Sequence, residues 1–275
     1  MSRHKVLNSP RLARRKRKEK KIKIAVLAIL TVVIVGATLY AVSLPHLLIQ
    51  RVELIGDSPV PEEDILSIVT SQLAGRSALV FPRASAFFFP SSATEKVLLT
   101  RFPVLQSVDI STKNFASLFV SVASREAVAL WCVPPELLSE NCAVVDRTGF
   151  AFEVLSPEES QRYPRISDFS ATSSVSLSVV AVSEPRLTSL LSLLRRLEEF
   201  SLEASEVELY GGGEMAVLLA NGGKILLRED GEFTSELDRL GALLSEQNLV
   251  PRNGGGVRVD YIDLRYGNKI YFKPR

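Results

Sequence analysis

An uncharged stretch of 21 residues, Ile24 to Leu44, lies directly behind a dense basic leader. At about 1.5 Å of rise per residue, a helix over this stretch is roughly 30 Å long, which matches the hydrocarbon core of a bilayer. The sequence therefore predicts a transmembrane helix over residues 24–46. A short tail, residues 1–23, precedes it, and a long folded part follows it.

Charge is distributed unevenly on the two sides of this stretch. Residues 1–23 contain 11 Lys and Arg and one acidic residue, Glu19, so their net charge is +10. The remaining residues contain 22 basic and 30 acidic groups, a net charge of −8. Basic flanks of a membrane span stay in the cytoplasm. We therefore expect a single-pass protein of the cell membrane, with a cytoplasmic N-terminus and extracytoplasmic C-terminal domains. The tail should also contact anionic lipids.

The N-terminal region has two alternative interpretations. A basic run is also typical of a nucleic-acid-binding tail, but this one has no interleaved aromatic residues and ends at a membrane span, so we expect no nucleic acid. Ala41-Val42-Ser43 resembles a signal-peptide cleavage site, but the apolar run exceeds the roughly 7–15 residues of a signal peptide. An uncleaved anchor is the favoured interpretation.

The chain has two cysteines, Cys132 and Cys142. An exterior location permits a disulfide between them. Two cysteines with no nearby histidine cannot supply the four ligands of a usual zinc site. We favour a disulfide over two free thiols and expect no metal.

The residues after the span predict an α+β fold in two parts, a small unit over residues 47–124 and a β-rich domain with flanking helices over residues 125–275. The small unit is expected to run strand, helix, helix, strand, strand: Leu47–Gly56, a helix starting near Pro61, Ser92–Phe102, Val104–Ser111 and Leu118–Trp131. Phe81 and Phe87-Phe88-Phe89 between its helices are read as a loop covering the core. The alternative is a patch that faces the membrane or a partner.

The β-rich domain shows clear local signals. Pro185–Phe200 is strongly amphipathic, as a helix on a sheet should be. Ala220-Asn221-Gly222-Gly223 separates two strand patterns and predicts a hairpin. Ser167–Ser178 is rich in serine and is expected to contain a loop. Further strands are expected at Ala143–Asp146, Phe150–Val154, Glu206–Tyr210, Val257–Leu264 and Lys269–Lys273, and a helix around Phe233–Leu244.

No catalytic device is apparent. The histidines, His4 and His46, lie in the basic leader and at the edge of the span, so a Ser-His-Asp or Cys-His arrangement has no base in the exterior part. Gly211-Gly212-Gly213 and Gly254-Gly255-Gly256 lack the flanking residues of phosphate-binding loops and predict turns. We expect no enzyme activity, no cofactor and no small-molecule substrate.

Three segments stand out: Ile49–Gly56 with Val60–Ile65, Val120–Trp131 with Val145–Phe152, and Tyr261–Tyr266. Together they resemble the FtsQ/DivIB family of bacterial cell-division proteins. Ile49–Gly56 with Val60–Ile65 looks like the opening of a POTRA domain. Val120–Trp131 followed by Val145–Phe152 resembles the family's Glu-Arg-x-Pro-Val-Ala-x-Trp strand and Val-Asp-x-x-Gly-x-x-Phe turn. Tyr261–Tyr266 is similar to its closing Asp-Leu-Arg strand.

The resemblance implies a non-enzymatic scaffold of the division complex that binds FtsB- and FtsL-type partners through its last strands. A strand at a sheet edge offers unpaired backbone groups that a partner strand can pair with. The alternative is that these strands only close the sheet. The residues expected to bind partners are Asp263, Leu264, Arg265, Tyr266, Lys269, Tyr271 and Phe272.

Two functions from other classes are alternatives to a role in cell division. One is a POTRA-bearing membrane factor for protein export or assembly. The other is a membrane-anchored enzyme acting on the cell wall, which the lack of an exterior histidine argues against.

Overall fold

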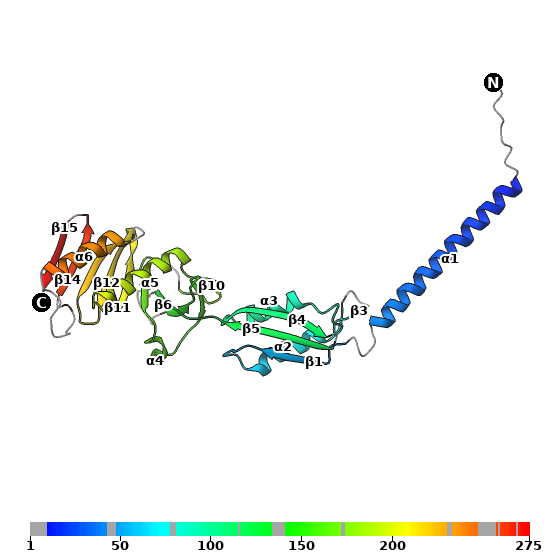
Figure 1. Ribbon diagram of the computed structural model, residues 1–275, viewed down its shortest axis with the longest axis horizontal. Helices are drawn as coiled ribbons and strands as arrows, with labels where there is room; N and C mark the ends of the chain where they lie inside the picture. The colour runs from blue at the N-terminus through cyan, green and yellow to red at the C-terminus, as the bar shows by residue number, and fades with distance from the viewer. Residues whose placement is uncertain are drawn as a thin grey trace, which may run out of the picture. The chain divides into compact units, whose positions relative to one another are not determined.

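The computed structural model describes residues 10–42, 48–77, 81–114, 116–133, 141–171, 174–229, 233–246, 257, 259–267 and 269–275. His4, His46, the Gly254-Gly255-Gly256 turn, and the ends of the predicted tail and span lie outside these residues. The chain divides into two compact units (Figure 1). The first comprises residues 1–98 and 107–123, and the second comprises residues 99–106 and 124–275.

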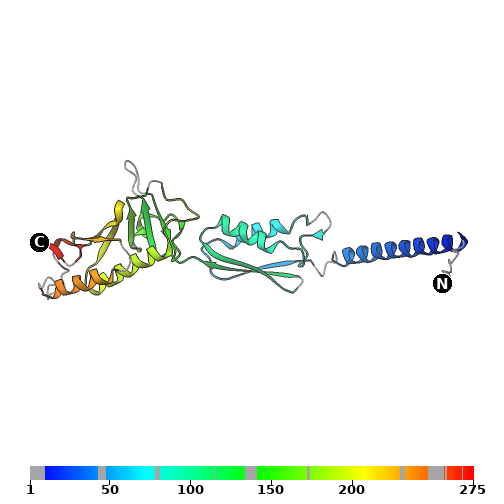
Figure 2. The same ribbon diagram turned by 90° about the horizontal axis from the view of Figure 1, so that it is seen from above.

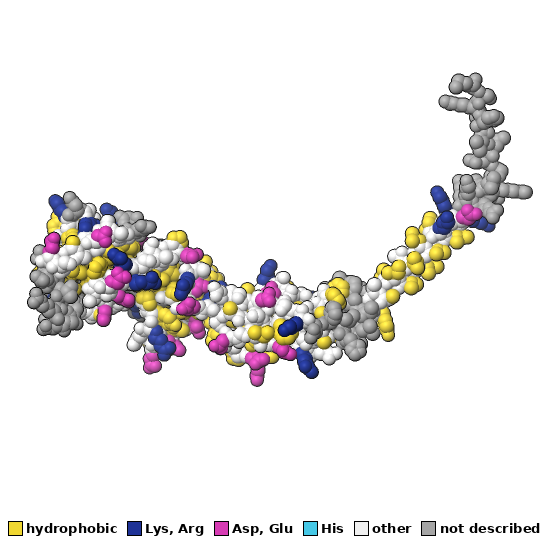
Figure 3. Space-filling view, viewed as in Figure 1, with side chains coloured by type: hydrophobic (Ala, Val, Ile, Leu, Met, Phe, Trp, Pro, Cys, Tyr) yellow, Lys and Arg dark blue, Asp and Glu magenta, His cyan; other side chains and the backbone are white. Residues whose placement is uncertain are grey.

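The N-terminal helix α1 runs from Pro10 to Val42. Its segment Lys18–Thr38 is long and apolar enough to cross a membrane. Large apolar side chains such as Ile24 and Tyr40 are exposed along it. In Figure 3, basic side chains (dark blue) gather near the start of α1 and apolar ones (yellow) cover the rest. A helix that is apolar on all sides suits lipid rather than water.

The first unit packs two helices on a three-stranded sheet of order β1-β5-β4, with β1 parallel to β5. Side chains along β5 alternate between the two faces of the sheet. Leu118, Val120 and Val122 are buried, whereas Ser121 is exposed, so one face of the sheet is apolar and packs in the core. The unit has the predicted order of strand, helix, helix, strand, strand, with an additional short pair of strands, Arg76–Ser77 and Phe81–Pro82, between the helices. The elements are β1 (Arg51–Ile55), α2 (Glu62–Leu73), β2 (Arg76–Ser77), β3 (Phe81–Pro82), α3 (Ser91–Arg101), β4 (Leu105–Asn114) and β5 (Ser117–Ser124).

The described residues of the second unit form a ten-stranded sheet of order β10-β8-β7-β6-β9-β11-β12-β13-β14-β15. Strand β9 is parallel to both β6 and β11, and β13 is parallel to β14. The strands are β6 (Ala129–Val133), β7 (Asn141–Val145), β8 (Phe150–Glu153), β9 (Arg165–Asp168), β10 (Val179–Val180), β11 (Ala204–Tyr210), β12 (Glu214–Leu219), β13 (Lys224–Arg228), β14 (Val259–Tyr266) and β15 (Lys269–Pro274).

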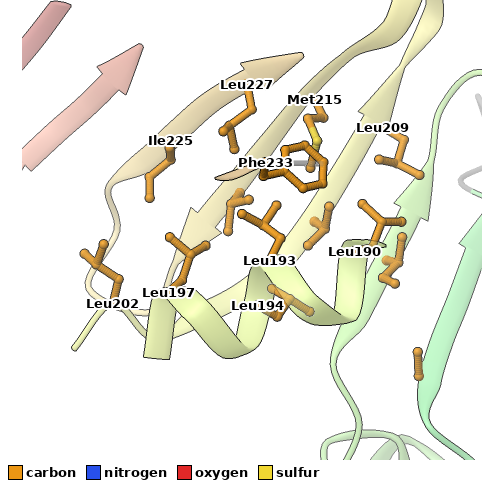
Figure 4. Close-up of a cluster of buried hydrophobic side chains, with 14 of the residues drawn as sticks. Leu190, Leu193, Leu194, Leu197, Leu202, Leu209, Met215, Ile225, Leu227 and Phe233 are labelled. Atoms are coloured by element: carbon orange, nitrogen blue, oxygen red, sulfur yellow. The ribbon is translucent and has the colours of Figure 1, made fainter. Parts of the chain in front are cut away.

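Helices α5 (Glu184–Glu199) and α6 (Thr234–Glu246) cover one face of this sheet (Figure 2). Leucines spaced three and four residues apart form the buried stripe of α5, and they meet sheet residues such as Leu209, Met215 and Ile225 (Figure 4). The short helix α4 (Pro157–Ser160) begins with a capping box between Ser156 and Glu159. The burial of so many leucines makes this cluster the main core of the unit.

Two features of the β-rich part differ from the sequence-based prediction. The expected long strand Leu118–Trp131 is two strands, β5 and β6, in different sheets. Strand β5 ends at Ser124 and β6 begins at Ala129. Just after β5, the Arg125 N–H donates to the carbonyl of Val104, the residue before β4 (2.8 Å). Strand β9, which ends at Asp168 inside the serine-rich segment, was not predicted, because Ile166 is the only apolar residue of that strand.

Candidate partner-binding edge

Strand β15 is the last strand of the ten-stranded sheet, and among the described residues it pairs with β14 alone. The pairing is antiparallel and brings Asp263 opposite Tyr271 and Ile262 opposite Phe272. The register shifts between Asp263 and Tyr266, which is an irregularity in the ladder. The outer side of β15 is therefore a strand edge available to another chain.

Arg265 is held in place by carboxylates on its own sheet. Its Nε donates to Asp263 Oδ1 at 3.0 Å, and its Nη2 donates to Asp263 Oδ2 at 2.8 Å. Its Nη1 lies 3.1 Å from Glu214 Oε1, on β12. The hydrogen bonds from Arg265 hold the pKa of the Asp263 carboxyl below its usual 3.8, although burial opposes this. Arg265 is thus pre-oriented on the sheet rather than loose in solvent.

Two tyrosines flank the turn between β14 and β15. Tyr266 is 56% exposed and Tyr271 is 49% exposed. Their rings meet edge to face, with centroids 5.5 Å apart, and the Arg265 guanidinium lies 5.7 Å from the Tyr266 ring. Exposed tyrosines beside arginine are the residue types favoured at the centre of protein interfaces.

The far end of β15 is fastened by a second charge cluster. Asp260 accepts from Lys273 Nζ at 2.7 Å and from Arg275 Nε at 3.0 Å. These bonds lower the pKa of Asp260 and raise that of Lys273. Arg275 also donates to the carbonyls of Asn221 and Gly222, both at 2.8 Å. Strand β15 is consequently tied to the β12–β13 hairpin as well as to β14.

The seven predicted partner-binding residues fall into two groups. Tyr266, Lys269 and Tyr271 are exposed, and Arg265 is half-buried. Asp263 and Leu264 are buried, and the half-buried Phe272 packs against the core cluster. The sequence did not indicate Glu214, Asp260 or Arg275. Isolated charged residues carry no pattern, and only the strand order brings them to the edge.

A second constellation lies at the other end of the sheet. Arg125 forms an ion pair with Asp146, and its Nε donates to the Pro103 carbonyl at 3.0 Å. The guanidinium carbon lies 4.0 Å from the Phe150 ring centroid. Asp146 Oδ1 also accepts from the N–H and hydroxyl of Thr148, at 2.9 and 2.6 Å. The two sequence motifs that contain Arg125 and Asp146 therefore fold into one site.

Cys132 and Cys142 lie directly opposite each other on β6 and β7, with Cα atoms 4.1 Å apart, and form a disulfide. Cys142 is half-buried and lines a pocket with Leu155 and Tyr163.

In the part of the chain that the structure describes, no group of three or more His, Cys, Asp or Glu residues is arranged to hold a metal ion.

These features define a class, an α+β protein with one candidate membrane span and a strand-rich domain that ends at an open sheet edge. Residues 137–265 match the family model described as "Cell division protein FtsQ/DivIB, C-terminal". This match supports the assignment to the FtsQ/DivIB family of cell-division proteins that the sequence motifs predicted. No sequence among the curated proteins matches this chain.

Proposed function

We propose that this protein is a non-enzymatic, single-pass scaffold of the division complex that recruits other division proteins through the edge strand β15. The partners are of the FtsB and FtsL type. The basic tail, residues 1–23, stays in the cytoplasm and contacts anionic lipids. Outside the membrane, a POTRA-like domain over residues 47–124 precedes a β domain over residues 125–275.

The observation that carries this proposal is the one-sided pairing of β15. An incoming strand gains backbone hydrogen bonds along the free side, and side-chain contacts give specificity. Tyr266 and Tyr271 supply exposed aromatic area next to this edge. Asp263, Leu264 and Phe272 contribute by keeping β14 and β15 in register.

Binding of the purified full chain to FtsB- and FtsL-type partners tests the proposal. The double variant Tyr266→Ala, Tyr271→Ala should bind roughly 30-fold more weakly, as expected when an interface loses about 2 kcal/mol. Tyr210→Ala is the matched control, because Tyr210 is also exposed but belongs to the interior strand β11. Undiminished binding by the double variant would exclude β15 as the docking edge.

A cellular experiment tests the division role itself. Depletion of the protein should give filamentous cells that fail to septate. Normal septation together with an export or assembly defect would instead favour the POTRA-bearing transport factor.

A further inference from the structure

The turn Ser85–Phe89 packs on the segment where the chain enters the first unit. The N–H of Ile49 donates to the Ala84 carbonyl at 2.7 Å, and Leu48 forms an antiparallel bridge with Ser85. The N–H groups of Phe88 and Phe89 both donate to the Ser85 carbonyl at 3.0 Å. Ser85 itself is fully buried. The turn is thus fixed to residues 48 and 49 by backbone hydrogen bonds.

Chain length limits how far this turn can lie from the membrane. Four peptide steps separate Leu44, the last residue of the 21-residue apolar stretch, from Leu48. At about 3.5 Å per step they span no more than ~14 Å. The headgroup layer adds about 5–7 Å to each side of the hydrocarbon core. If α1 crosses the membrane, the turn is within reach of the headgroups.

Phe87 is the exposed residue of this turn, at 60%, whereas Phe88 and Phe89 are half-buried. An aromatic side chain held out on a rigid turn loses little conformational entropy when it enters an apolar layer. A large apolar side chain held in water beside a membrane is characteristic of interfacial anchoring.

The charges at this end of the unit are of one sign. The N–H groups of Gln50 and Arg51 donate to the Ala116 carbonyl at 2.8 and 3.1 Å, so the start of β5 lies at the same end as the turn. The three segments that meet there carry Arg51, Arg83 and Lys113 and contain no Asp or Glu. These segments are residues 48–52, 83–91 and 112–118. The first acidic residue along β1 is Glu53, opposite Phe119.

The opposite end of β1 has the reverse charge. Residues 55–65, which join β1 to α2, contain Asp57, Glu62, Glu63 and Asp64 and no Lys or Arg. The unit therefore has a basic end next to its membrane tether and an acidic end away from it. This polarity complements an anionic lipid surface.

We propose that the basic end of the first unit docks on the outer surface of the membrane that α1 crosses. Phe87 enters the interfacial layer, and Arg51, Arg83 and Lys113 face anionic headgroups. Each cation near such a surface favours docking by about fivefold. The docking depends on α1 being a membrane span, but it does not depend on β15 binding a partner.

Spin labelling of the full chain in lipid nanodiscs tests this docking. A nitroxide is attached at Phe87→Cys, and separately at Lys113→Cys in case the first variant misfolds. Glu63→Cys, at the exposed acidic end of the unit, is the matched control. In discs with anionic lipid, the labels at 87 and 113 should be shielded from a water-soluble nickel complex and accessible to oxygen. The label at 63 should remain accessible to nickel.

Charge removal provides the second arm. Arg51→Gln combined with Arg83→Gln should lower the docked population at label 87 by about fivefold per cation. Discs of purely zwitterionic lipid should also lower the docked population. Equal nickel accessibility at 87, 113 and 63 in anionic discs would overturn the proposal. Shielding that appears only when a partner protein is added would overturn it as well. Neither result would bear on partner binding at β15.

Discussion

Arg125 and Asp146, which lie 21 residues apart in the sequence, form an ion pair. This pair joins the two sequence motifs that contain them. Both side chains are largely buried, with exposed fractions of 15% and 6%. Arg125 also bonds the Pro103 carbonyl, and Asp146 also bonds the turn that follows it. The pair therefore connects the segment between β5 and β6, the segment before β4 and the β7–β8 turn.

Arg125→Ala should lower the free energy of unfolding by about 3 kcal/mol, because it leaves the buried Asp146 carboxylate without its cation. Arg147→Ala is a matched control, since Arg147 pairs with Glu126 at 3.4 Å and both are 76% exposed. That control should cost no more than about 0.5 kcal/mol. Urea denaturation of the two variants measures the difference, and equal losses would contradict it.

The same ion pair should make the free energy of unfolding depend on pH. Burial alone would raise the pKa of Asp146, but hydrogen bonds from Thr148, Arg125 and Phe150 outweigh burial and hold the pKa below its usual 3.8. A lowered pKa in the folded state stabilises the protein above pH 3.8, and this stability is lost as the pH falls through the lowered value. Asp146→Asn should therefore be less stable than the wild type at pH 7, and the gap should narrow at pH 3. A gap that is constant with pH would count against this linkage.

Gly149 closes the turn after Asp146 with a left-handed φ of 77°. A Cβ atom there would lie 1.9 Å from the Val182 carbonyl oxygen, whereas at Gly212, with φ of 79°, it would meet nothing within 4 Å. Gly149→Ala should lower the free energy of unfolding by more than about 4 kcal/mol. Gly212→Ala should cost only the backbone strain of about 1–2 kcal/mol. Thermal melts of both variants give the comparison, and similar melting temperatures would refute it.

Reduction of the Cys132–Cys142 disulfide should lower stability by about 2–3 kcal/mol, as expected for a bridge with a sequence separation of 10. Denaturation with and without reductant measures the loss. The double variant Cys132→Ala, Cys142→Ala should not respond to reductant. A response by that variant would show that the reductant acts elsewhere.

Local patterns predicted most of this fold. The leucine spacing of α5 and the Asn221-Gly222 hairpin depend on residues close in sequence, and the structure has both. Strand β9 could not be predicted, because its Arg-Ile-Ser-Asp sequence has no alternation of apolar residues, and its place in the sheet depends on β6 and β11.

The candidate edge was only partly predictable for the same reason. The sequence of β14 and β15 indicated two strands, and the family resemblance pointed to their role. The contact between Arg265 and Glu214 crosses β13 and depends on strand order, which no local pattern encodes. Likewise, the burial of Leu264 follows from which face of β14 meets the helices.

The central position of β9 has a mechanical consequence. The chain enters the second sheet at β6, and a partner at β15 would pull on the opposite edge, so tension between them crosses β9. This strand pairs through three residues with β6 and four with β11. The β13–β14 ladder on the same path also pairs through only three residues. We therefore expect single-molecule pulling between the anchor and β15 to rupture the sheet first at β9 or between β13 and β14.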